Sequence, residues 1–207
     1  MISLDVFNRE RIWQNTDYWF ASSDITISIL RIPMFERNES DIDQNNIALT
    51  SNSVTALLKA ESGHEVIAEV IKESWGQPSD QEIKMLAYYD IKPQRSWIRE
   101  VLLKTNGETR ALARILVVEP ELAQVRWVQE LGDKPLGGTL FSQYEPVREY
   151  AERECAAFNE ILKNFSEEGQ SRALQNGFSF EGQYWLRSSV LNIENKVHCL
   201  VTECFLS

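Results

Sequence analysis

Apolar and polar residues alternate along several stretches of the chain, and this alternation predicts antiparallel strand pairs. The first pair lies in 95–118, where Asn106-Gly107 supplies the positive φ angles that a two-residue hairpin turn needs. The second pair consists of YWLRSSVLNI and KVHCLVTECFL near the C-terminus. A shorter alternation in HEVIAEVIKESW favours another strand over a helix.

Apolar residues at helical spacing predict three helices. The stretch SNSVTALLKAESG begins with cap residues and stops at Gly63, and a second helix is expected between Pro120 and Gly132. A longer helix is expected from Pro146 onward. Its apolar stripe consists of Val147, Tyr150, Ala151, Cys155, Phe158, Ile161, Leu162 and Phe165. We expect this stripe to be core, with Cys155 as a buried filler.

Hairpins with helices between them predict an α+β fold, an antiparallel β-sheet with helices packed on one side. The polar, turn-rich stretch ERNESDIDQNN divides the chain into an N-terminal extension, 1–45, and one globular domain, 46–207. A domain of that length can bury a core without disulfides or metals.

Composition narrows the classes of partner. The net charge of −10 and pI of about 4.8 disfavour binding to nucleic acid or to anionic membranes. The sequence shows no signal peptide and no apolar run of about 20 residues, so we expect no membrane association. Three cysteines without framework spacing indicate reduced thiols in a cytoplasmic protein. Two histidines far apart make a metal site improbable, and we expect a monomer.

The first hairpin carries charges within its apolar stripes. A regular two-residue turn at Asn106-Gly107 places Arg99 directly opposite Arg114, on one face with apolar neighbours. A shift of one residue would separate the two side chains. Like charges that face each other on a sheet are destabilising, so an anion is expected to meet this pair.

The last predicted strand carries a carboxylate in a similar position. Glu203 shares its strand face with Val197, Cys199, Val201 and Phe205. It is a candidate partner for the arginines, and also a candidate acid or base. One carboxylate cannot neutralise two guanidinium groups, so a net positive pocket for a carboxylate ligand is expected. Internal salt bridges or edge strands produce the same pattern, and the residues alone leave both readings open.

The same segments resemble the chorismate lyase family. The resemblance rests on SWIREVLL followed by NGE and ALARILVVEP, on LGDKPLGGTLF, and on LVTECFL at the C-terminus. These motifs keep the family's order, and together they cover most of 50–207. The 152–183 tract is longer than the bacterial enzymes lead us to expect.

The resemblance implies an activity and a set of site residues. It implies conversion of chorismate to 4-hydroxybenzoate and pyruvate, without a cofactor. Arg99 and Arg114 correspond to the family's ligand-binding arginines, and Glu203 corresponds to its active-site glutamate. Leu136 corresponds to the residue whose backbone N–H binds the product carboxylate, and Val54 to a lining residue. We therefore expect Glu203 and Arg99 to be catalytic, and Arg99, Arg114, Leu136 and Val54 to bind the substrate.

Two other functions fit the same residues. Effector-sensing domains of some transcription regulators resemble this fold, so the chain could be a non-catalytic module that binds small carboxylates. A related enzyme that converts chorismate or isochorismate to another product is the third reading.

Overall fold

The computed structural model describes residues 51–92, 94–144 and 146–206, so the expected 1–45 extension lies outside the described residues. A six-stranded antiparallel sheet forms its centre, with strand order β1-β2-β3-β6-β5-β4. The strands are β1 (Val66–Gly76), β2 (Ser96–Thr105), β3 (Glu108–Val118), β4 (Val147–Ala157), β5 (Gln183–Ile193) and β6 (Val197–Phe205). The predicted α+β antiparallel fold is therefore confirmed.

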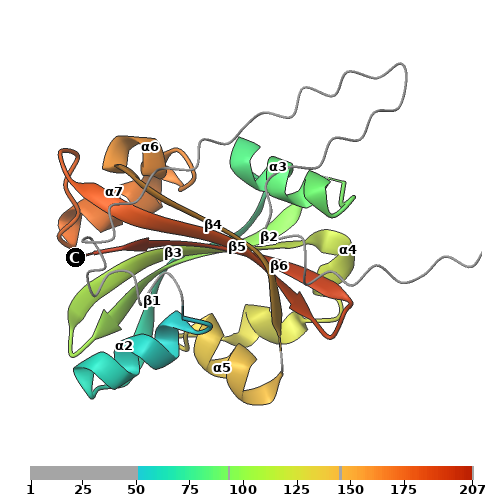
Figure 1. Cartoon of the computed structure of the whole chain (residues 1–207), viewed down its shortest axis with the longest axis horizontal. Helices are drawn as coiled ribbons and strands as arrows, with labels where there is room; N and C mark the ends of the chain where they lie inside the picture. Colours follow the sequence, from blue (N-terminus) through green and yellow to red (C-terminus); the bar gives the residue numbers. More distant parts are fainter. Residues whose placement is uncertain (1–50, 93, 145, 207) are drawn as a thin grey trace, which may run out of the picture. The chain divides into compact units, whose positions relative to one another are not determined.

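Helices cover both faces of this sheet, and the expectation of helices on one side only is wrong (Figure 1). One face, which we call the pocket face, carries α2 (Val54–Ser62), α4 (Glu119–Leu122), a 3₁₀ helix (Arg126–Glu130) and α5 (Leu136–Gln143). The opposite face carries α3 (Asp80–Tyr88), α6 (Phe158–Leu162) and α7 (Glu167–Gln175). Both faces of the central strands are apolar, so helices must pack on each face to exclude water from it.

The strongest local signals are confirmed. Asn106 and Gly107 both have positive φ and join β2 to β3, while the predicted C-terminal pair forms β5 and β6. Helix α2 begins after Ser53, whose hydroxyl accepts a hydrogen bond from the Ala56 N–H, and ends at Gly63 in the left-handed region.

Two predicted helices differ from the structure. The segment after Pro120 divides into α4 and the 3₁₀ helix, although its apolar residues still face the core. The long helix expected from Pro146 is instead the edge strand β4 followed by the short helix α6. Cys155 lies on β4 and is exposed, so its prediction as a buried filler is wrong. The β4 sequence is also rich in charged residues, which are common on edge strands because they prevent pairing with other chains.

Among the described residues, no helix has the length and apolarity needed to cross a membrane.

Candidate functional site

The two arginines singled out in the first hairpin lie on opposite faces of the sheet. Glu100, not Arg99, pairs with Arg114, while Arg99 pairs with Ile115. The register shifts by one residue beyond the turn because Arg110 forms a β-bulge in β3. The predicted juxtaposition of Arg99 and Arg114 is therefore wrong, since one extra residue exchanges the faces of all residues after it.

Arg114 belongs to a buried ion cluster on the opposite face. Its Nε and one terminal nitrogen donate to the two carboxylate oxygens of Glu82, at 2.8 and 3.1 Å. Its other terminal nitrogen donates to Glu100 at 2.7 Å. Burial alone lowers the pKa of Arg114, but hydrogen bonds from it to Glu82 and Glu100 and their charges raise it overall. Glu100 also accepts a hydrogen bond from the Ser166 N–H, so the cluster joins α3 to the N-terminus of α7.

Arg99 lies on the pocket face but is buried beneath a loop. It pairs with Glu73, and one terminal nitrogen donates to the carbonyl oxygens of Gly132 and Lys134, at 2.6 and 3.3 Å. Its Nε has no hydrogen-bond partner within the described ranges. Both carbonyls belong to the loop that leads into α5, and that of Lys134 directly precedes Pro135, so Arg99 anchors this loop.

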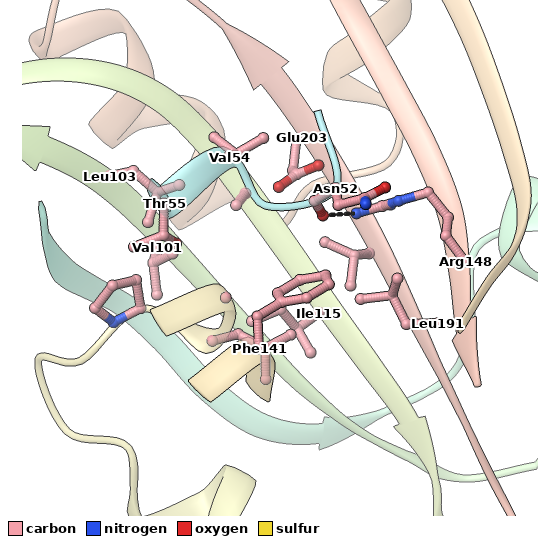
Figure 2. Close-up of a pocket in the computed structure, with 15 residues that line it drawn as sticks. Asn52, Val54, Thr55, Val101, Leu103, Ile115, Phe141, Arg148, Leu191 and Glu203 are labelled. Carbon is pink, nitrogen blue, oxygen red and sulfur yellow. Dashed lines mark hydrogen bonds between the residues drawn. The ribbon is translucent and has the colours of Figure 1, made fainter. Parts of the chain in front are cut away.

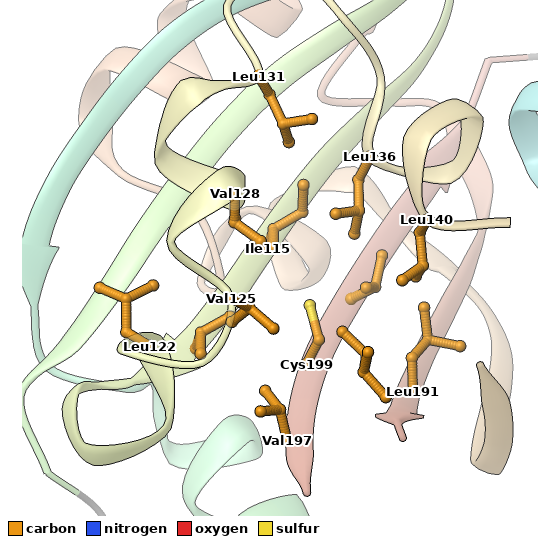
Figure 3. Close-up of a cluster of buried hydrophobic side chains, with 13 residues drawn as sticks. Ile115, Leu122, Val125, Val128, Leu131, Leu136, Leu140, Leu191, Val197 and Cys199 are labelled. Atoms are coloured by element: carbon orange, nitrogen blue, oxygen red, sulfur yellow. The ribbon is translucent and has the colours of Figure 1, made fainter. Parts of the chain in front are cut away.

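A pocket opens on this face between α2, α5 and the central strands (Figure 2). The space between its lining residues amounts to about 440 Å³, which includes open solvent. Three predicted site residues line it, namely Val54, Leu136 and Glu203. Its apolar floor, which includes Ile115 and Leu191, continues into the core beneath α5 (Figure 3).

Glu203 is held by an arginine that the sequence analysis did not select. Arg187 pairs with Glu203 across β5 and β6, and its Nε and one terminal nitrogen both donate to Oε2, at 2.8 and 2.6 Å. In the part of the chain that the structure describes, Oε1 of Glu203 accepts no hydrogen bond. One carboxylate oxygen on the pocket wall therefore remains available to a ligand.

Two helix N-termini meet at the pocket. Val54 and Thr55 begin α2, while Leu136 and Gly137 begin α5, and all four line the cavity. The first-turn N–H groups of a helix have no acceptor within the helix, and no side chain of the described residues caps α5. These N–H groups and the helix dipoles favour a carboxylate at this end of the pocket.

The two N-termini approach closely because Gly137 has no side chain. A Cβ at this position would lie 2.7 Å from the Thr55 hydroxyl oxygen and 3.2 Å from that of Ser53.

Arg148 of β4 is a second arginine that sequence reasoning missed, and unlike Arg187 it lines the pocket. It donates to the hydroxyl of Ser189 and, at 2.8 Å, to the carbonyl oxygen of Asn52 (Figure 2). Its segment was predicted as helix, so no strand alternation was sought there. For Arg187 a signal did exist, since it alternates with Trp185 and Ser189 on the face that it shares with Glu203.

Comparison with known proteins gives the site its context. A model of the family described as chorismate lyase matches residues 44–207. The chain belongs to the chorismate lyase family. The resemblance that the sequence motifs suggested is thus confirmed.

Curated relatives in this family match over part of their length. A probable chorismate pyruvate-lyase of Marinobacter nauticus is 34% identical over 95 residues, which are 45% of this chain and 49% of the relative. A chorismate pyruvate-lyase of Enterobacter sp. is 33% identical over 115 residues, 53% of this chain and 66% of the relative. The chain therefore spans about half to two thirds of the curated relatives that it matches.

Solved structures share the fold of this chorismate lyase family member at low identity. PhnF from Mycobacterium smegmatis superposes with a TM-score of 0.54 at 14% identity. The match covers 76% of this chain and 64% of PhnF. The separate effector domain of PhnF gives a TM-score of 0.50 at 14% identity. This match covers 74% of this chain and 87% of that domain. At this identity the similarity concerns the fold alone.

Proposed function

We propose that this protein is a lyase that converts chorismate to 4-hydroxybenzoate and pyruvate. The observation that carries the proposal is the position of Glu203, whose available oxygen shares one pocket with the N-termini of α2 and α5 in a chain of this family. The reaction needs a site that binds a dianion and meets a ring hydroxyl, and this pocket combines both features.

The substrate's chemistry sets two tasks for the site. Chorismate carries a ring carboxylate, an enolpyruvyl carboxylate and a 4-hydroxyl group. The ether bond breaks, its electrons leave with the enolpyruvyl group, and the hydrogen on C4 departs as a proton. The released enolpyruvate takes up one proton on its methylene carbon and becomes pyruvate. The ring becomes aromatic, which drives the reaction, so the protein mainly orients the dianion and stabilises the charge that moves to the leaving group.

We assign the carboxylates to the cationic end of the pocket. The N–H of Leu136, at the start of α5, binds the ring carboxylate, and the first turn of α2 beside Val54 adds a second positive helix end. The guanidinium group of Arg148 supplies a full positive charge on the pocket wall.

The remaining predicted residues take different parts. Oε1 of Glu203 accepts the hydrogen bond of the 4-hydroxyl group and lies beside the C4 proton. Arg99 contributes by fixing the loop that presents Leu136. Arg114, predicted to bind substrate, lies on the opposite face, and its proposed part is to stabilise the sheet beneath the pocket.

The test is to incubate the purified protein with chorismate and to measure pyruvate and 4-hydroxybenzoate together. We expect both products in equal amounts. Glu203→Ala should lower kcat by roughly 100-fold or more, the usual effect of losing a positioned acid or base. Arg172→Met, which removes an arginine from an exposed ion pair with Glu69, is the control and should keep wild-type turnover.

A carboxylate-binding module without catalysis is the second candidate. It is favoured by the positions of Arg99 and Arg114, because neither of the two residues that correspond to the family's ligand-binding arginines lines the pocket. The same assay separates the candidates. Binding of chorismate or 4-hydroxybenzoate without release of pyruvate would support the module and exclude the lyase.

A further inference from the structure

Arg187 joins the candidate catalytic carboxylate to the segment that closes the pocket. We propose that Arg187 is a positioning residue, whose single guanidinium group both orients Glu203 and holds the start of α2 over the ligand. The inference rests on the proposed function where it concerns the ligand, but its structural part can be tested without turnover.

The first step concerns the orientation of Glu203. Both hydrogen bonds from Arg187 go to Oε2, so the carboxylate is fixed in rotation about its last bond. Arg187 is fully buried, and its guanidinium carbon lies 6.0 Å from the ring centre of Phe205, which limits its own movement. Oε1 is the oxygen that Arg187 leaves to a ligand, and the Glu203 side chain lines the pocket (Figure 2).

The second step concerns the segment that precedes α2. The remaining terminal nitrogen of Arg187 donates to the carbonyl oxygen of Ser51 at 2.7 Å. On the neighbouring strand, Arg148 donates to the carbonyl oxygen of Asn52 at 2.8 Å. Two adjacent strands thus hold two consecutive carbonyls, directly before the N-cap Ser53. The position of the α2 N-terminus therefore depends on the same guanidinium group as Glu203.

The planar guanidinium group suits this double role. Its Nε and two terminal nitrogens donate in fixed directions within one plane, so the carboxylate and the Ser51 carbonyl are held in a fixed relation. A lysine at this position can keep an ion pair with Glu203 but has one flexible ammonium group for both partners. Arg187→Lys should retain part of the function, whereas Arg187→Met should lose both contacts.

The ligand test uses two compounds that differ only in the hydroxyl group, 4-hydroxybenzoate and benzoate, with affinities measured by calorimetry. We expect the wild-type protein to favour 4-hydroxybenzoate roughly tenfold, since a hydrogen bond to a charged acceptor is worth about that factor. Arg187→Met should reduce the preference to about one while both compounds still bind. Glu203→Gln should do the same, Arg187→Lys should restore part of it, and Arg172→Met should leave it unchanged.

The structural test needs no ligand. Hydrogen exchange is measured at the amides of Ala56 and Leu57, whose acceptors are the side chain and carbonyl of Ser53. Arg187→Met should accelerate exchange there roughly tenfold while the central strands remain protected. Unchanged exchange, or a hydroxyl preference that survives in Arg187→Met, would overturn the proposal. A wild-type protein that binds neither acid would contradict the proposed function, and the exchange data would then decide the role of Arg187.

Discussion

Three arginines are buried in the described part of the chain, and they differ in what surrounds them although each lies within a strand. Arg99 is bound by loop carbonyls and Glu73, Arg114 by two glutamates, and Arg187 by Glu203 and a backbone carbonyl. A buried guanidinium group is stable only where such acceptors satisfy it. The acceptors around an arginine therefore determine its role, which is either to position groups of the pocket or to stabilise the sheet.

Arg114 should matter for stability more than for binding. Arg114→Met leaves the carboxylates of Glu82 and Glu100 buried without their cation, so we expect the free energy of unfolding to fall by about 3–5 kcal/mol. Urea unfolding followed by circular dichroism measures the change. A variant with wild-type stability that no longer binds 4-hydroxybenzoate would place Arg114 in the pocket and refute the observed register.

Strands and helices follow their sequence signals where those signals are local. The turn at Asn106-Gly107 and the caps of α2 depend on residues that are neighbours in sequence, and they are predicted correctly. The helix predicted from Pro146 fails because Val147–Ala157 pairs with 183–192 of β5, and distant pairing overrides local propensity. Part of the apolar stripe that suggested this helix is nevertheless buried, since Phe158, Ile161 and Phe165 belong to the core.

The candidate site was predictable only in part, for a related reason. Glu203 stands out on an apolar stripe, while Val54 and Leu136 depend on family motifs, and the pocket brings these three together. The β-bulge at Arg110 has no sequence signal, so the faces of Arg99 and Arg114 could not be assigned from alternation. The alternation of β5 could indicate that Arg187 points to one face, but its pairing with Glu203 depends on the register between two strands. A single sequence does not reveal that register.

The bulge itself can be tested by removing it. Deletion of Arg110 should give a regular hairpin that keeps Arg114 opposite Glu100. The hydrogen bond from the Leu206 N–H to the Arg110 carbonyl is lost, so unfolding should become easier by only about 1 kcal/mol. Urea unfolding is again the measurement. Had the hairpin been regular, the same deletion would turn the apolar residues of β3 to the wrong faces and unfold the protein.

The contact between α2 and α5 should control affinity for the ligand. Gly137→Ala places a methyl group against Thr55, which separates the two helix N-termini, and we expect the dissociation constant for 4-hydroxybenzoate to rise roughly tenfold. Gly138→Ala is the matched control, because its nearest neighbour is 3.6 Å away and affinity should stay within about twofold. The double variant Gly137→Ala/Thr55→Ala should recover affinity, and its failure to do so would argue against the steric explanation.

At the scale of the whole domain, the sheet separates two groups of buried polar side chains, one on each face. The pocket face contains Glu203 with an available oxygen, while the opposite face contains the closed cluster of Arg114, Glu82 and Glu100. A net charge of −10 makes the protein's overall field unfavourable to the dianion that we propose as its substrate. Arg148 and the two helix N-termini must therefore act locally, where low polarity strengthens their field.

Burial of two thiols gives the folded domain a specific sensitivity to alkali. Burial raises the pKa of Cys199 and Cys204 from 9.0 to about 12, and the charge of Glu121 adds to the effect on Cys199. Above about pH 9 these thiols ionise in the unfolded chain while the folded protein keeps them protonated, so stability falls as pH rises toward 12. By about pH 10.5 we expect a loss of roughly 2 kcal/mol per thiol in urea unfolding.

A variant without these thiols isolates their contribution from that of every other group that titrates in alkali. Cys199→Ala/Cys204→Ala should begin less stable, because truncation leaves space in the core, but its stability should decline less steeply with pH. Lysines and tyrosines titrate equally in both proteins, so the difference between the two slopes belongs to the thiols. Parallel slopes from pH 8 to about pH 10.5 would mean that Cys199 and Cys204 ionise as readily in the folded protein as in the unfolded chain, and that the core around them is open to water.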